Sequence, residues 1–280
     1  MVHRIGFNLN ISKGLLSSVK YAKELEINFY QIFLSNPQSY NAIAFDKSTL
    51  NEFKLLLEKN DIKVVIHSQY LINFCNETNS EKYKKSVKCL IDDIKAANLI
   101  GAIGVVVHMG RACELDKSTA FNNYVTGIKK VLSQVSKGVI ILETGAGIKS
   151  EICSSLFGLY RLFNSFTTKE KERIKICIDT CHVFSYGYNL NDTEYVSYFC
   201  NMIETLFSWK NIACIHLNDS KKELNSKKDR HQDIGKGYVG ENGLKEFTKI
   251  CLSNAIPIVL ETPCKILSKT EQLKIVKSWI

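Results

Sequence analysis

Histidine and acidic side chains recur along this chain at the ends of short apolar segments. The stretch Cys177–Leu190, CIDTCHVFSYGYNL, places Asp179 and His182 three residues apart just where an apolar segment ends. Five other apolar segments also end in a histidine or a glutamate: His67, His108, Glu143, His216 and Glu261. Imidazole and carboxylate groups are typical zinc ligands, and they also suit manganese and iron. The sequence therefore indicates a site for divalent cations.

A second pair of candidate ligands lies in the later segment DRH. In an extended segment Asp229 and His231 lie on one side and Arg230 faces away, so both side chains can bind the same ion. The candidate set then has nine members, and among the six histidines of the chain only His3 is outside it. One tetrahedral zinc uses about four ligands, so nine suggest two or three ions that share carboxylates. Such a cluster would stay positive and attract phosphate.

Each of these residues is weak evidence when it is taken alone. A histidine at a strand end is more often a hydrogen-bonded structural residue than a ligand, and an acidic residue is commonly a helix cap. Cys181 lies between Asp179 and His182, and we expect it to be a buried structural thiol, because free cysteine is usually buried and inert. The set becomes informative if its members meet, because crowded charges repel one another unless cations neutralise them.

Eight short apolar or alternating segments predict the strands that would bring these residues together. Segments with helical periodicity lie between them, as in Val87–Ile94 and Phe121–Leu132, and Ser48 and Thr270 are candidate helix caps. This alternation predicts an α/β fold, a single (β/α)8 TIM barrel over residues 1–280 with the metal site at the C-terminal ends of the strands. The predicted strands are Arg4–Asn10, Phe29–Ser35, Val64–Ser68, Ala102–Met109, Val139–Thr144, Lys175–Thr180, Ile212–Asp219 and Pro257–Thr262.

Composition is compatible with a DNA-binding protein but does not require one. The formal net charge is +9, from 37 Lys and Arg against 28 Asp and Glu. This excess favours a polyanionic partner, and a lysine-rich solvated surface would explain it equally well. The ten cysteines form no CxxC pair, so we expect most of them to be reduced and buried. No segment is apolar enough to span a membrane and the N-terminus lacks a secretory pattern, so we expect a cytoplasmic, nuclear or viral location.

Longer segments resemble the signatures of the endonuclease IV family of apurinic/apyrimidinic (AP) endonucleases. These are HSQYLIN, CIDTCHVFSYGYNL, IHLNDSK, DRHQDIGKGYVG and VLETP, which match in order and spacing between about Gly6 and about Glu261. The resemblance implies a TIM barrel with three zinc ions per chain, although manganese would suit part of the site. It implies that His67, His108 and Glu143 hold the first ion and that Glu143 bridges to the second. Asp179, His216 and Glu261 would complete the second ion's ligands, and His182, Asp229 and His231 would hold the third.

The resemblance also implies a reaction and a substrate. The family hydrolyses the phosphodiester 5′ to an abasic site in duplex DNA, leaving a 3′-hydroxyl and a 5′-deoxyribose phosphate, and trimming of blocked 3′ ends is a further expected activity. Glu261 and Glu143 are the expected catalytic residues, and a monomer suits an enzyme that straddles a bent duplex. Tyr70 and Leu71 match the loop that wedges into the duplex, an apolar insertion of known type. Gln38 and Arg230 are further expected DNA contacts.

Four positions depart from the family pattern, and two other functions stay open. Gln38 stands where an arginine is frequent, Met109 where proline is common, and Thr144-Gly145 in ETGAG replace the residues of ENTAG. A sugar isomerase or epimerase would bind one or two ions with the late-strand residues alone, without His182 and the DRH segment. A catalytically silent, metal-stabilised DNA-binding barrel is the other alternative. The complete ligand set argues against both.

Overall fold

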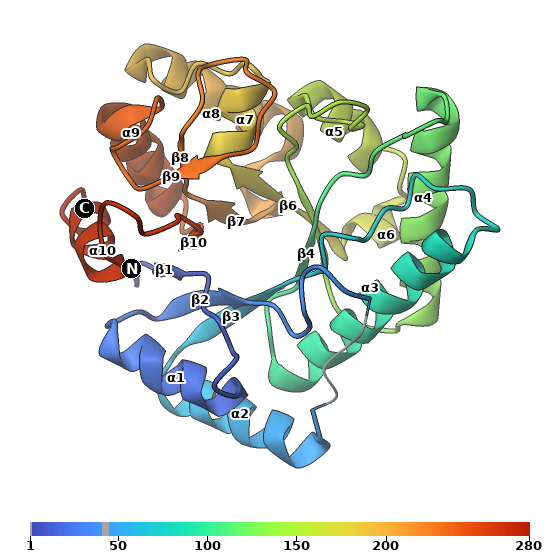
Figure 1. Ribbon diagram of the computed structural model, residues 1–280, viewed down its shortest axis with the longest axis horizontal. Coiled ribbons are helices and arrows are strands. Elements are labelled where there is room, and N and C mark those ends of the chain that lie inside the picture. Colours follow the sequence, from blue (N-terminus) through green and yellow to red (C-terminus); the bar gives the residue numbers. More distant parts are fainter. Residues whose placement is uncertain (1, 41–44) are drawn as a thin grey trace.

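A computed structural model describes residues 2–40 and 45–280 of the chain. Eight parallel strands form one sheet in the order β1-β10-β7-β6-β5-β4-β3-β2. The sheet closes on itself between its two ends, because Asn8 and Gln31 form a parallel bridge and the Leu9 N–H donates to the Gln31 carbonyl at 2.8 Å. Figure 1 shows the strands at the centre of the molecule. They are β1 Ile5–Phe7, β2 Phe29–Ile32, β3 Lys63–His67, β4 Val105–Val107, β5 Ile140–Glu143, β6 Ile174–Asp179, β7 Ile212–His216 and β10 Ile258–Leu260.

Helices surround the barrel and cover the outer face of the strands (Figure 1). The predicted TIM barrel and all eight predicted strands are confirmed, with each boundary within three residues of its expected position. The longer helices are α1 Leu15–Glu24, α2 Lys47–Lys59, α3 Glu81–Ile100, α4 Lys117–Gln134, α5 Leu156–Phe163, α8 Thr193–Phe207, α9 Gly240–Ser253 and α10 Lys269–Lys277. Shorter elements are α6 Thr168–Lys171, α7 Thr180–Tyr186 and the 3-10 helix η1 Trp209–Asn211.

The two predicted helix caps were wrong by two residues each. Helix α2 is capped by Asp46, whose carboxylate accepts from the Thr49 N–H at 2.8 Å, and not by Ser48. Helix α10 is capped by Ser268, which forms a capping box with Glu271, and Thr270 lies inside the helix. A cap residue has extended backbone and precedes the first helical residue, so the earlier polar residue of each pair takes the role.

Two apolar cores lie on the two sides of the barrel wall. The larger core packs the outer face of the strands against the helices, and the predicted stripe on α3 is buried there, as at Leu90 and Ile94. A smaller core fills the barrel interior. It consists of one side chain from each of seven strands: Phe29, Val65, Val106, Ile141, Cys177, Cys214 and Val259.

The inner core explains how the strands position the candidate ligands. Alternate residues of a strand point to the same face, so the residue two positions after each inner-core residue also points into the barrel, one layer nearer its carboxyl end. These next residues form a ring at the mouth: Gln31, His67, His108, Glu143, Asp179, His216 and Glu261. Six of its seven members are therefore predicted ligands. The alternation of side chains along the strands of a closed barrel is what brings these six ligands together.

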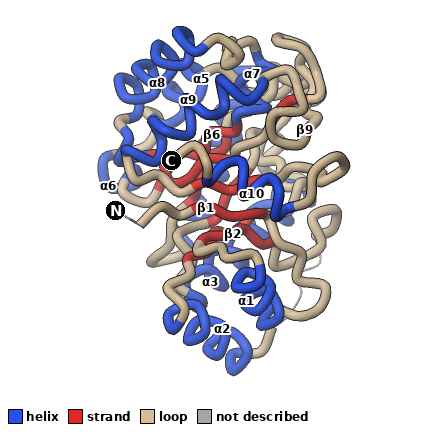
Figure 2. Tube along the Cα trace, turned by 90° about the vertical axis from the view of Figure 1, so that its left-hand side faces the viewer, coloured by secondary structure: helices blue, strands red, loops and turns tan. Residues whose placement is uncertain are grey.

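The other three predicted ligands lie beyond the strands at the same end, one in a helix and two in a loop. His182 lies in α7, and Asp229 and His231 lie in the long connection between β7 and α9, which contains the antiparallel pair β8 Asp219–Ser220 and β9 His231–Gln232. The buried Asp219 carboxylate holds the end of this connection, accepting from the backbone N–H groups of Gly237 and Val239 at 2.9 Å each. Figure 2 shows the loops gathered on one side of the barrel, with β9 among them.

A helix that crosses a membrane has to be both long and apolar. In the part of the chain that the structure describes, no helix meets both conditions.

Candidate metal centre

The nine predicted ligands meet in three groups at the barrel mouth. In the first group, His67, His108 and Glu143 place their ligand atoms within 4.8 Å of one another. His67 Nε2 lies 3.3 Å and His108 Nδ1 lies 3.5 Å from the same oxygen, Glu143 Oε2. Two neutral imidazole nitrogens and one carboxylate oxygen that converge in this way are a typical three-residue set for zinc.

The second group shares Glu143 with the first. Glu143, Asp179, His216 and Glu261 again lie with their ligand atoms within 4.8 Å. His216 Nδ1 is 2.9 Å from Glu143 Oε1, 3.1 Å from Glu261 Oε2 and 3.8 Å from Asp179 Oδ2. Glu143 therefore directs one oxygen to each group, which is the geometry that a carboxylate bridging two ions requires.

The third group comes from the loops. Asp229 directs one carboxylate oxygen to each of two histidines, with 3.2 Å from Oδ2 to His182 Nε2 and 3.2 Å from Oδ1 to His231 Nε2. The predicted pairing of Asp229 and His231 on one side, with Arg230 exposed, is confirmed. His231 Nε2 is buried and lies 3.2 Å from Asp229 Oδ1 and 3.6 Å from Asp179 Oδ2, but neither contact has good hydrogen-bond geometry. A buried nitrogen in this condition fits a ligand of a cation.

Backbone carbonyls select which nitrogen of two histidines can bind an ion. The carbonyl of Ser68 lies 2.7 Å from His67 Nδ1, and the carbonyl of Thr144 lies 2.8 Å from His182 Nδ1. A carbonyl only accepts, so in each ring Nδ1 carries the proton and Nε2 presents a lone pair to its group. Thr144 also accepts from the Asp179 N–H at 2.9 Å through Oγ1. Sequence reasoning treated Thr144 only as a departure from the family pattern and missed this role.

In the absence of ions the acids and the imidazoles shift one another's pKa values strongly. Burial acts to raise the pKa of Glu261, but the neighbouring His216 outweighs it and lowers the pKa to about 2. Burial acts to lower the pKa of His231, but Asp179 and Asp229 raise it to about 9. Burial dominates at His108, where the pKa falls to about 4. At neutral pH the Glu261 carboxylate is therefore ionised and His231 carries a proton, which a bound cation would displace.

Two sets of cysteines lie close to these groups. Cys181 places its sulfur within 4.8 Å of ligand atoms of Asp179 and His231, and burial raises the pKa of its thiol to about 12. A protonated thiol is a poor ligand, which favours the predicted bystander role. Cys177 and Cys214 lie equally close to His216 from the inner core below. All ten cysteines are free, and seven of them are buried, as predicted.

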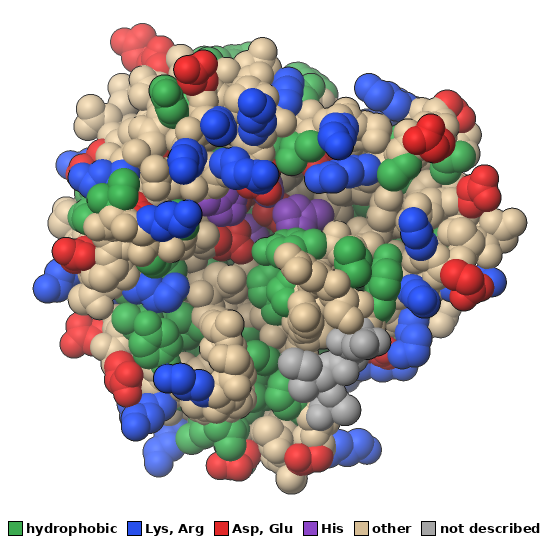
Figure 3. Space-filling model, viewed as in Figure 1, with side chains coloured by type: hydrophobic (Ala, Val, Ile, Leu, Met, Phe, Trp, Pro, Cys, Tyr) green, Lys and Arg blue, Asp and Glu red, His purple; other side chains and the backbone are tan. Residues whose placement is uncertain are grey.

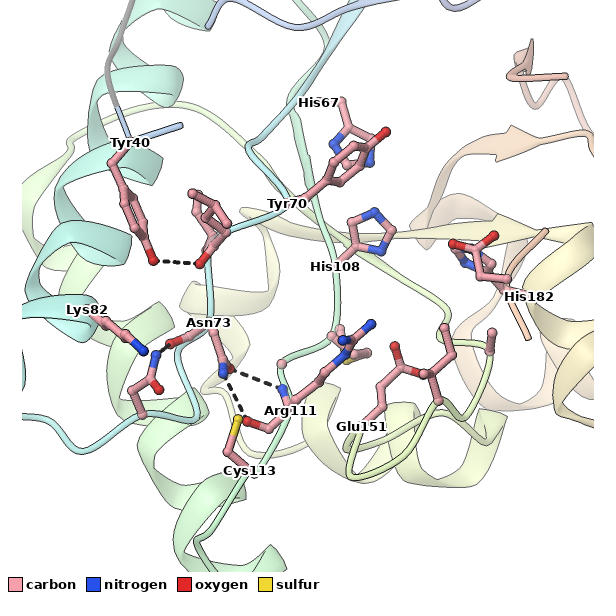
Figure 4. A pocket seen from close by; sticks show the side chains of 18 of the residues that line it. Tyr40, His67, Tyr70, Asn73, Lys82, His108, Arg111, Cys113, Glu151 and His182 are labelled. Carbon is pink, nitrogen blue, oxygen red and sulfur yellow. Dashed lines mark hydrogen bonds and ion pairs between the residues drawn. The ribbon is translucent and has the colours of Figure 1, made fainter. Parts of the chain in front are cut away.

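A cavity of about 580 Å³ opens over the ligands and extends sideways along the mouth. Histidines 67, 108, 182 and 231, with Asp229 and Glu261, line one end, and Tyr40, Leu71, Lys82 and Arg111 line the other. Figure 4 shows Tyr70 beside His67 and His108, with Tyr40 and Lys82 on the far side from His182. The cavity thus connects the metal groups to the loop after β3.

The predicted wedge residues, Tyr70 and Leu71, line this cavity and are partly exposed to solvent. Tyr70 is 54% exposed and Leu71 is 40% exposed, although the Tyr70 ring also packs edge-on against His67 and His108. The Tyr40 hydroxyl donates to the Leu71 carbonyl at 2.7 Å and fixes the backbone of this loop. Gln38 is exposed but is not among the described residues that line the cavity.

Basic side chains surround the mouth. In Figure 3 the histidines lie in a central hollow beside acidic groups, with Lys and Arg side chains gathered above them and hydrophobic side chains below. Exposed basic residues in the loops at this end of the barrel include Arg111, Lys221, Lys228, Arg230 and Lys236. Such a rim attracts a polyanion and leaves the metal ligands accessible through its centre.

The other two departures from the family pattern are accommodated by their surroundings. Met109 is buried and contributes to the cavity wall. Gly145 lies against Glu151, whose carboxylate would clash with any side chain there and which accepts from the Gly147 N–H at 2.6 Å. Neither departure displaces a candidate ligand.

Comparison with known proteins groups the chain with endonucleases. The model of the xylose isomerase-like TIM barrel family matches residues 19–278. The putative endonuclease 4 of Acanthamoeba polyphaga mimivirus is 40% identical over 100% of this chain and 94% of its own length. The probable endonuclease 4 of Sulfurihydrogenibium sp. (strain YO3AOP1) is 32% identical over 92% of each chain. The crystal structure of endonuclease IV from Thermus thermophilus superposes with a TM-score of 0.85 at 28% identity, covering 99% of this chain and 98% of that one.

Similarity to sugar-converting barrels is limited to the fold. A D-tagatose 3-epimerase-like protein superposes with a TM-score of 0.73, covering 99% of this chain and 96% of that one, at 17% identity.

Removal of metal should make the stability of the protein sensitive to alkaline pH. In the metal-free protein the pKa of His231 is raised to about 9, so its stabilising contribution is full below about pH 6.5 and is lost as pH rises through 9. Metal binding requires deprotonated ligands, so zinc-loaded protein should instead keep its stability over this range. Thermal unfolding at pH 7 and pH 9.5, with and without chelator, measures both trends.

The variant His231→Gln isolates this contribution from other titrating groups. Its chelated form should lose less stability between the two pH values than the chelated wild type. An equal loss in the two proteins would contradict the assignment.

Proposed function

We propose that this chain, which belongs to the endonuclease 4 (endonuclease IV) family of xylose isomerase-like TIM barrels, incises duplex DNA on the 5′ side of abasic sites. It is a metal-dependent DNA repair endonuclease, and the specificity for abasic sites is the part that we propose. The products would be a 3′-hydroxyl and a 5′-deoxyribose phosphate. The observation that carries the proposal is the convergence of all nine predicted ligands beside a cavity with a basic rim.

Three zinc ions per chain are the proposed cofactor, one for each group of ligands. The donor set supports this, because four carboxylates and five imidazoles crowded into one mouth fit divalent cations better than they fit one another. Manganese would suit the carboxylate-rich second group. When bound, the ions would lower the pKa of a water and neutralise the charge of the reacting phosphate.

Glu261 and Glu143 have different proposed roles. Glu261 lines the cavity, so its carboxylate can orient a water that attacks the phosphate and accept its proton. Glu143 is only 1% exposed, and both of its oxygens face histidines rather than the cavity. Its proposed role is therefore to bridge two ion sites and fix their separation.

Recognition of a missing base is assigned to the loop after β3. An abasic sugar lacks pairing, so pulling it out of the helix costs less than flipping an intact nucleotide. Leu71 and Tyr70 would fill the space left in the duplex, and the bond from Tyr40 to the Leu71 carbonyl would hold that loop against the DNA. Arg230 is exposed beside the third group and would contact a phosphate, with Gln38 a weaker contact farther away.

The sugar isomerase alternative is less consistent with the site. An isomerase or epimerase needs one or two ions and a small closed pocket. Here the third group of His182, Asp229 and His231 adds ligands that such chemistry does not use, and the cavity continues along the mouth to Lys82 and Arg111. We propose that the chain acts as a monomer with one TIM-barrel domain over residues 1–280.

The variant Glu261→Gln should abolish most of the incision. Losing a positioned proton acceptor typically costs 10²- to 10⁴-fold, so we expect kcat on a synthetic abasic duplex to fall by about 1,000-fold. Glu223→Gln provides a matched control, because Glu223 is exposed on the same connection between β7 and α9 and lies outside the candidate groups. Gel analysis of the cleaved strand measures the rate and identifies the 3′ end.

Failure of the wild type to cut the abasic duplex while metal-loaded would contradict the proposed function. Turnover of an aldose or ketose in place of DNA would support the isomerase, and tight DNA binding without incision would support the silent barrel.

The variant Leu71→Ala should weaken recognition of duplex substrate. Contacts of an inserted side chain contribute about 1–3 kcal/mol, so KM for the abasic duplex should rise about tenfold with little change in kcat. The effect should be smaller on a single-stranded abasic oligonucleotide, where no stack has to be filled. Leu55→Ala is the control, because Leu55 is 65% exposed on α2. An equal effect on the two substrates would argue against a wedge.

A further inference from the structure

The ring at the barrel mouth has a seventh member that sequence reasoning did not consider. Gln31 lies two residues after the inner-core residue Phe29 on β2, just as Glu143 follows Ile141 and Glu261 follows Val259. Its side chain is fully buried. A neutral amide at a ring position otherwise occupied by metal ligands needs a physical explanation, because a buried polar group is costly unless it is hydrogen-bonded.

Both ends of the Gln31 amide are bonded to members of the second group. Nε2 donates to Glu261 Oε1 at 2.6 Å, and Oε1 lies 2.8 Å from His216 Nε2. The ionised carboxylate of Glu261 can only accept, so the amide must turn its NH2 toward Glu261 and its oxygen toward His216. An amide oxygen also only accepts. His216 must therefore carry its proton on Nε2.

This bond pattern decides how His216 faces the candidate ion site. Nδ1 faces Glu143 Oε1, at 2.9 Å, and Glu261 Oε2, at 3.1 Å; with the proton kept on Nε2, a cation bound between these oxygens would take the Nδ1 lone pair. The same amide occupies Glu261 Oε1 and leaves Oε2 for that space. One side chain thus orients two of the four residues of the second group.

The backbone of Gln31 is held as firmly as its side chain. It pairs with Val65 of β3 on one side and forms the parallel bridge to Asn8 on the other, where the barrel closes. The amide is therefore preorganised by the sheet and is not free to follow the ligands. A partner that holds the second nitrogen of a ligating histidine fixes its tautomer and ring orientation, and its loss typically costs 10- to 100-fold in metal affinity or activity.

We propose that Gln31 is a positioning residue of the second metal site, which sets the tautomer of His216 and the orientation of Glu261. The inference rests on the proposed metal-dependent function, but its effect on metal binding can be measured without any DNA. Gln31 contacts neither the cavity nor, by this proposal, the substrate, so it acts only through the two residues that it bonds.

The test compares Gln31→Met with Tyr30→Phe. Methionine keeps a similar volume and removes both hydrogen bonds. Tyr30 is the preceding residue of β2, is equally buried, and bonds Ser18 on the helix side of the sheet, so Tyr30→Phe removes a buried hydrogen bond away from the ligands. Stepwise zinc affinity by competition with a chelator is measured with thermal stability and with kcat and KM on the abasic duplex.

For Gln31→Met we expect one of the bound ions to dissociate roughly 10- to 100-fold more readily, and kcat to fall by a similar factor, with KM for DNA within about twofold of wild type. Tyr30→Phe should lower thermal stability and leave zinc affinity unchanged. Wild-type zinc affinity and kcat in Gln31→Met would overturn the proposal. Weakened zinc binding in this variant, combined with a wild type that does not cut abasic DNA, would refute the proposed function and leave the role of Gln31 standing.

A measurement on the wild type covers the case in which Gln31→Met does not fold. Long-range ¹H–¹⁵N NMR spectra of the zinc-loaded protein report which nitrogen of each histidine carries a proton. We expect His216 to be protonated at Nε2 and bound through Nδ1. The opposite assignment would overturn the proposal.

Discussion

Electrostatic repulsion among the acidic groups at the barrel mouth is the constraint on which the structure depends. Glu143 and Asp179 are buried on adjacent strands, Glu261 faces them with its side chain 11% exposed, and Asp229 approaches from the connection after β7. Histidines relieve this repulsion only in part, because the pKa of His231 is raised to about 9 whereas burial lowers the pKa of His108 to about 4. Divalent cations relieve it at any pH at which the imidazoles are neutral. The fold therefore brings the ligands together, and the charge of bound cations would stabilise the arrangement.

The link between fold and site is unusually direct in this chain. Alternate residues of a strand point to the same face, so Ile141 and Val259 lie in the inner core, and Glu143 and Glu261, two positions later, lie at the mouth. Closure of the sheet brings β2 next to β1, so Gln31 faces its partners across the ring. Substitutions in the inner core would for this reason disturb metal geometry as well as stability.

Sequence reasoning predicted the parts of the structure that follow from periodicity. Sequence alternation was enough to predict the strands and the ligand that lies at the end of each strand. It also predicted that Asp229 and His231 lie on one side of an extended segment. Contacts between distant segments were not. Gln31 is neutral and lies in an apolar strand, so its type gives no sign that it bonds His216, which is 185 residues away. Thr144 was read only as a substitution because its bond to Asp179 depends on how two strands pack. The predictions of the two helix caps were wrong because several polar residues near each helix start could serve as the cap.

Three cations held by three separate ligand groups are the central claim, and anomalous diffraction from zinc-loaded crystals tests it most directly. Data collected on both sides of the zinc absorption edge should show three peaks per chain: one between His67 and His108, one between His216 and Asp179, and one between His182 and His231. A single peak, or histidines bonded only to neighbouring protein atoms in the presence of excess zinc, would contradict it.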